Sequence, residues 1–167
     1  MTVPVMGRPI VPKEHGAWAV LYGAFLAGVG VAGQVTVPVL LFLVGITATA
    51  FANGSLSILA RSAPGQAQEG RRRHALAWFL TYAAVAAAAL GPLLMVFRMT
   101  FLLPFGMGAA FFLVLRAFLV RARDDRTLVG ELVGAIGLTM VGAASHAVAV
   151  GGVQPIGAVL WLLLFLF

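Results

Sequence analysis

The stretch TVPVLLFLVGITATAFANGSLSILAR (residues 36–61) combines a long apolar run with polar side chains near its end. A helix that spans a bilayer needs about 20 mostly apolar residues, and residues 36–60 meet that length. Residues four apart share one face of a helix. The run therefore carries one polar stripe, which consists of Thr49, Asn53, Ser57 and Arg61. A polar stripe on an apolar helix indicates that a polar partner, a cavity or another helix lies beside it.

The composition of the whole chain is that of a membrane protein. Hydrophobic residues make up 62% of the 167 residues and charged residues 10%, against about 45–50% and 25% in soluble domains. The absence of cysteine excludes disulfides and thiolate ligands. Metal binding or acid–base chemistry would depend on five acids and three histidines. We predict no metal site and no resident cofactor.

Six apolar segments predict an all-α, polytopic transmembrane helical bundle that forms one domain over residues 1–167. The predicted spans are residues 16–33, 36–60, 75–97, 99–120, 130–150 and 155–167. Five of them are complete and the sixth is incomplete, so we expect the chain to continue beyond Phe167. The first segment is longer than the 7–15 apolar residues of a signal peptide, and we interpret it as a permanent helix.

Basic residues between the spans predict the orientation of the chain, because Lys and Arg concentrate in cytoplasmic loops. They occur in the N-terminal tail, in residues 61–73 and in residues 116–126, whereas Arg98 falls on the other side. We therefore place the N-terminus and both basic loops in the cytoplasm.

This topology brings polar residues from several spans to the cytoplasmic side of the bundle. Charged groups inside a membrane usually pair or face the bundle interior, so Glu14 and Glu131 are candidates to meet Arg61 or Arg116. The alternative is that these side chains snorkel to the headgroups. Asn53 lies about two turns inside the helix and cannot snorkel, and its alternative role is an interhelical hydrogen bond.

From this convergence we predict a cavity that faces the cytoplasm and binds a ligand. Its predicted lining residues are Lys13, Glu14, His15, Asn53, Ser57, Arg61, Arg116 and Glu131. We assign none of them a catalytic role. His15 is either a ligand contact or proton acceptor near neutral pH, or a capping residue at a helix N-terminus. His146 lies away from this group, so we interpret it as structural.

The basic run at the start of the third span predicts contact with anionic lipid headgroups, which attract each basic residue by about 1 kcal/mol. It consists of Arg71, Arg72 and Arg73. The run has no aromatic interleaving and no nucleic-acid-binding fold beside it, so we predict membrane lipids as partners and no nucleic acid.

Helix packing and capping are also predictable. Small residues allow helices to approach closely, and two rows of them are His15, Ala19, Gly23 and Ala27, and Ala135, Thr139, Ala143 and Ala147. Asp124 or Asp125 is the expected N-cap of the fifth span.

Three passages resemble the YwiC-like family of bacterial multispanning membrane proteins. They are PKEHGAWAVLYGAFLAG (residues 12–28), RRRHALAWFLTYAAVAAAALGPLL (residues 71–94) and GELVGAIGLTMVGAASHAVAVGG (residues 130–152). The KEHGAW block at residues 13–18 is the most specific part. The resemblance implies a multi-pass protein of the bacterial cytoplasmic (inner) membrane, and the family brings no established biochemical function with it.

A fainter resemblance, at the level of architecture, is to the UbiA-type intramembrane prenyltransferases. Their second helix ends in an Asn-Asp-x-x-Asp pattern that holds magnesium and a prenyl diphosphate. This sequence has Asn53-Gly54-Ser55-Leu56-Ser57 at the corresponding place, so the asparagine matches and both aspartates are absent. Without carboxylates this segment lacks the usual oxygen ligands of Mg²⁺.

Three functions therefore stay open. The first is a non-catalytic membrane protein whose cavity binds a lipid, a quinone-like molecule or a membrane-protein partner. The second is a divergent UbiA-like prenyl or lipid transferase, for which Mg²⁺ would be the cofactor. The third is a transporter of small solutes, although no inverted repeat is found.

Overall fold

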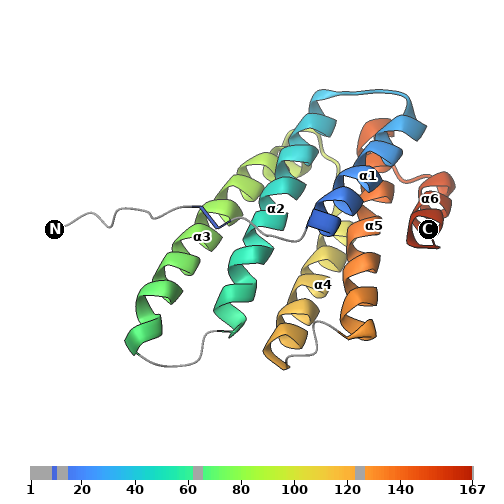
Figure 1. Cartoon of the computed structure of the whole chain (residues 1–167). Coiled ribbons are helices and arrows are strands. Elements are labelled where there is room, and N and C mark those ends of the chain that lie inside the picture. Colours follow the sequence, from blue (N-terminus) through green and yellow to red (C-terminus); the bar gives the residue numbers. More distant parts are fainter. Residues whose placement is uncertain (1–8, 11–14, 62–65, 123–126, 167) are drawn as a thin grey trace.

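The structure is a computed structural model that describes residues 9–10, 15–61, 66–122 and 127–166. Throughout these ranges the regular elements are helices and no strand occurs. They are α1 (His15–Ala32), α2 (Val37–Arg61), α3 (Gln66–Met95), α4 (Leu102–Ala122), α5 (Leu128–Val150) and α6 (Pro155–Leu166). Figure 1 shows α2 and α3 side by side as a long hairpin, with α6 at the opposite edge of the bundle. The all-helical fold is confirmed.

Four of the helices are long and apolar enough to cross a membrane, namely Val37–Ala60, Glu69–Met95, Leu102–Arg121 and Leu128–Val150. These four identify a multi-pass membrane protein. The apolar segments Gly16–Ala32 and Pro155–Leu166 are shorter. The predicted count of five complete spans is therefore not confirmed, because α1 falls short of the length of its neighbours.

Helix α1 packs most extensively on α5 through small residues. On α5 the predicted small row is confirmed, because Thr139, Ala143 and Ala147 are buried. On α1 the predicted row was wrong, because Ala19 and Gly23 are exposed. The buried face of α1 instead includes Leu21, Ala24, Phe25 and Gly28. Two large side chains on that face bury more apolar area than the row of small residues would.

The hydrophobic core lies between the α2–α3 hairpin and the α1–α5 pair. Val39, Leu93 and Val148 are almost completely buried there. Within the hairpin, Gly45 of α2 lies directly against the Leu90 side chain of α3. These contacts fix how α2 and α3 are aligned along the bundle.

The ends of α5 are set by local hydrogen bonds. The Thr127 side chain accepts a bond from the Gly130 amide over 3.4 Å and acts as the N-cap. The predicted caps, Asp124 and Asp125, lie outside the described residues, and the prediction was wrong because Thr127 fills that position. At the other end Gly151 adopts a left-handed conformation with φ of 74°, which glycine allows without steric cost.

The two ends of the bundle differ in charge. We call one the basic end, because Arg71, Arg72 and Arg73 lie there in the first turns of α3 and Arg121 lies there in the last turn of α4. At the opposite end the Gln34 side chain donates a hydrogen bond to the Ala149 carbonyl over 2.7 Å. This bond joins the α1–α2 turn to the end of α5.

Candidate functional site

Only some of the polar side chains in the α2 stripe form hydrogen bonds within their own helix. Thr49 donates to the Gly45 carbonyl over 2.9 Å, and Ser57 donates to the Asn53 carbonyl over 3.0 Å. Asn53 itself is partly exposed. Its amide is therefore the group of the stripe that is best placed to meet another molecule.

Arg116 lies on the face of α4 that packs against α5. Successive turns of α4 bring Gly108 beside Met140, Phe112 beside Gly137, and Arg116 beside Gly134. A methyl group added to Gly134 would lie 3.7 Å from Arg116 Nη1. The glycine thus leaves room for the guanidinium between the two helices, and the arginine points toward its neighbour in the bundle.

Contacts between α1 and α2 place the first turn of α1 at the level of Asn53. The Tyr22 and Thr47 hydroxyls are 3.3 Å apart, and one turn further the Trp18 and Phe51 rings are 5.1 Å apart. The two helices run in opposite directions (Figure 1), so the next turn pairs the start of α1 with residues near Asn53. We call Asn53, Arg116 and the first turn of α1 the polar layer.

The other predicted cavity residues are less informative. Glu131 is exposed in the first turn of α5, where the helix dipole favours a negative charge. Lys13 and Glu14 lie outside the described residues. His15 and Arg61 belong to α1 and α2, but their side chains lie outside the description. Of the eight predicted residues, the structure therefore places Asn53, Ser57, Arg116 and Glu131.

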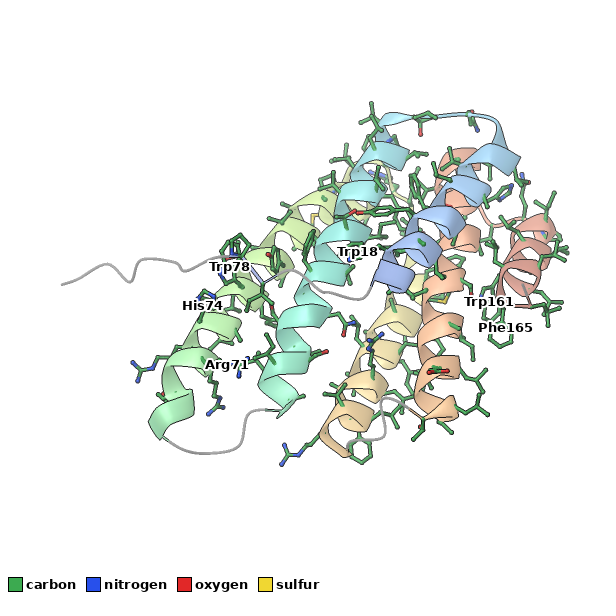
Figure 2. All side chains as sticks on the ribbon, in the orientation of Figure 1. Trp18, Arg71, His74, Trp78, Trp161 and Phe165 are labelled. Carbon is green, nitrogen blue, oxygen red and sulfur yellow. The ribbon has the colours of Figure 1, made fainter. Side chains whose placement is uncertain are left out.

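The basic run is exposed along the first turns of α3. Arg73 Nε lies 3.1 Å from Glu69 Oε1 in an exposed ion pair, and such pairs contribute little to stability. Figure 2 shows Arg71 at the basic end of α3. This placement keeps the three arginines in reach of headgroups or water.

Sequence reasoning missed a continuous row of aromatic rings across three helices. The centroid distances are 6.5 Å for His74–Trp78, 5.3 Å for Trp78–Tyr82 and 5.2 Å for Tyr82–Phe51. The row continues from Phe51 to Trp18 on α1. Figure 2 labels His74, Trp78 and Trp18 of this row. The four-residue spacing of His74, Trp78 and Tyr82 in the sequence was the signal that could have revealed it.

The row also contacts the chain that precedes α1. The Tyr82 hydroxyl donates to the Ile10 carbonyl over 3.3 Å, although Tyr82 lies well inside α3. Pro9 and Ile10 are not helical. A non-helical stretch of backbone therefore reaches the level of the aromatic row.

The chemistry available at the polar layer is hydrogen bonding and attraction of negative charge. The arginine and the amide both donate, and the amide also accepts. In the described part of the chain, no three His, Asp or Glu side chains come together in a way that could hold a metal ion.

The apolar helices, the buried small-residue crossing and the polar layer define a polytopic helical membrane protein. The chain belongs to the YwiC-like protein family, whose family model matches residues 11–146. The suspected family resemblance is thereby confirmed. Neither the curated proteins nor the solved structures gave a match.

Proposed function

We propose that this YwiC-like protein is a non-catalytic membrane protein that binds the polar head of a hydrophobic ligand, a lipid or a quinone-like molecule. The binding site is the polar layer of α1, α2 and α4, next to Gly134 of α5, and it opens toward the basic end. The ligand's tail extends along the apolar helix surfaces. A membrane-protein partner that inserts a polar group at this place is the competing occupant.

One observation carries this proposal: the partly exposed Arg116 of α4 has its Nη1 beside Gly134 of α5, inside the bundle. A guanidinium inside the membrane costs at least a few kcal/mol. Gly134 leaves space for it. The partly exposed Asn53 amide lies 16 residues from the start of α2, and Arg116 lies 14 residues from the start of α4. A cost of this kind is usual at functional sites.

The basic end is proposed to face the cytoplasm of a bacterial cell, with the protein in the inner membrane. The arginine bias supports this orientation, because the basic residues of α3 and of the end of α4 lie on one side. In this orientation Arg71, Arg72 and Arg73 contact anionic lipid headgroups at the membrane surface.

The experiment compares the lipids and other small molecules that remain bound to the purified protein. Asn53→Leu removes the amide and keeps a side chain of similar size, so ligand retention should be lost. Gln154→Leu is the matched control, because it removes an exposed amide at the opposite end. Equal retention by the Asn53→Leu variant and the unchanged protein would contradict the proposed site.

A UbiA-like transferase is supported less well. Its carboxylate pairs are absent from the Asn53 segment. Magnesium-dependent binding of a prenyl diphosphate to the purified protein would favour the transferase over the binding protein.

A further inference from the structure

His146 is a buried polar side chain that the polar layer does not use. It lies on α5, four residues before the last residue, Val150, and only 3% of it is exposed. Within the described part of the chain, its ring atom Nδ1 has no hydrogen-bond partner. Buried polar atoms nearly always have a partner, which is either protein or ordered water. The ring therefore indicates that a further group binds at this place.

The histidine ring lies against the first turn of α6. Gly157 is the third residue of α6 and is buried. A carbon added to Gly157 would lie 3.8 Å from His146 Nδ1 and 3.7 Å from the Ala143 carbonyl oxygen, and α5 offers it no closer contact. The glycine thus leaves a small space between α5 and α6, with polar atoms of α5 beside it.

The first turn of α6 contributes hydrogen-bond donors on the other side. The first amides of an α-helix have no partner within the helix, and they form the positive end of the helix dipole. Here the Gly157 amide donates to the Gln154 carbonyl over 3.0 Å, and His146 Nδ1 is not joined to any of these amides. A neutral imidazole has one donor and one acceptor nitrogen. A group that both donates and accepts can satisfy Nδ1 in either form.

We propose that one water molecule binds in the space beside Gly157 and links His146 of α5 to the first turn of α6. Buried waters in proteins usually have two to four polar partners. The partners at this place are His146 Nδ1, the Ala143 carbonyl and an amide of α6. The water adds a polar link to the bond from Trp161 Nε1 to the Ile136 carbonyl, which joins the same two helices over 3.4 Å. This inference is independent of ligand binding at the polar layer.

Two substitutions that differ by one oxygen atom test the water. The methyl group of Gly157→Ala makes only ordinary contacts of 3.7–3.9 Å, but it takes the place of the water and leaves Nδ1 without a partner. The hydroxyl of Gly157→Ser extends one bond beyond that carbon and can donate to or accept from Nδ1. We expect Gly157→Ala to lower the Tm by about 2–4 °C and Gly157→Ser to keep it.

The control is Gly106→Ala near the start of α4, because nothing lies within 4 Å of the added carbon. Alanine favours a helix more than glycine does, so this control should keep or raise the Tm. Without a bound water, Gly157→Ala should do the same. A Tm of Gly157→Ala at or above that of the unchanged protein, or equal losses in Gly157→Ala and Gly157→Ser, would overturn the proposal.

Nuclear magnetic resonance of the full chain with ¹⁵N-labelled histidine detects the water directly. Magnetisation should pass from water to the His146 ring, whose signal is assigned by its absence from His146→Gln, and Gly157→Ala should abolish this transfer. His74 is partly exposed near the start of α3 and serves as the positive control. Transfer to His74 but not to His146, or transfer to His146 that persists in Gly157→Ala, would contradict a water at this place.

Discussion

Ser145 of α5 donates a hydrogen bond to the Phe25 carbonyl of α1 over 3.1 Å. The same hydroxyl lies 3.0 Å from the Gly142 carbonyl of its own helix. Gly28 lies directly against Ser145 and Gly142, so the two backbones touch where a side chain would not fit. This contact holds the short helix α1 in position and thereby determines where the polar layer forms.

The close approach at Gly28 predicts that Gly28→Ala destabilises the protein. The added methyl group would overlap Ser145 and the Gly142 carbonyl, and overpacking of this kind costs about 1–3 kcal/mol. The free energy of unfolding in mixed micelles measures the effect. Gly23→Ala is the control, because nothing lies within 4 Å of the added carbon. Equal stability of the two variants would contradict the tight crossing.

Removing the hydroxyl group should have different effects on stability at two buried serines. Ser145 and Ser55 are both 0% exposed, but Ser55 Oγ has no hydrogen-bond partner in the described part of the chain. Ser145→Ala should lower the free energy of unfolding by about 1 kcal/mol, because the variant loses the hydrogen bond to the Phe25 carbonyl. Ser55→Ala should leave it unchanged or raise it. Denaturant titration of both variants tests the contrast, which fails if Ser55→Ala is the more destabilising.

Tyr82 has two separable roles in the aromatic row. Tyr82→Phe keeps the ring contacts with Phe51 and Trp78 and removes the hydrogen bond to the Ile10 carbonyl, so a loss of about 1 kcal/mol is expected. Tyr82→Ala also removes the two ring contacts and should cost about 1–3 kcal/mol more, because each aromatic pair contributes about 0.5–1.5 kcal/mol. Thermal unfolding followed by circular dichroism ranks the two variants by stability. A Tyr82→Phe variant as unstable as Tyr82→Ala would show that the hydrogen bond, and not the rings, dominates.

The space beside Gly134 predicts a graded effect on ligand retention. Gly134→Ala places its carbon 3.7 Å from Arg116 Nη1, which is ordinary van der Waals contact, so the arginine should keep its position. Gly134→Leu fills the same space and should displace Arg116, and retention should be lost. Mass spectrometry of extracted small molecules gives the readout, alongside a stability measurement on each variant. Retention by a folded Gly134→Leu variant would mean that Arg116 is not needed in that place.

The sequence predicted the helical class and most of the polar residues because these follow from local signals. Apolar length is sufficient to predict α2 and α5, and helical spacing is sufficient to predict the stripe that includes Asn53. The packing face of α1 was predicted wrongly, because small residues occur on two faces of that helix and only the partner helix decides between them. Phe25 and Gly28 match the surface of α5, whereas Ala19 and Gly23 do not meet it.

The depth at which α1 begins was not predictable from its own residues. It depends on contacts with residues distant in the sequence, such as Tyr22 with Thr47 and Gly28 with Ser145. The same holds for Arg116, because its spacing on α4 does not reveal that Gly134 faces it. Long-range contacts therefore decide the geometry of the site, whereas its composition can be read from the chain.

The most direct test of the binding site is native mass spectrometry of the full chain released from gentle detergent. The unchanged protein should carry a bound small molecule, and Arg116→Gln should lose it, because the glutamine has no positive charge to hold a polar head. Arg121→Gln is the matched control, because Arg121 is exposed near the end of the same helix, and this variant should keep the adduct. An adduct that survives in the Arg116→Gln variant, or that disappears equally from both variants, would contradict a binding site at the polar layer.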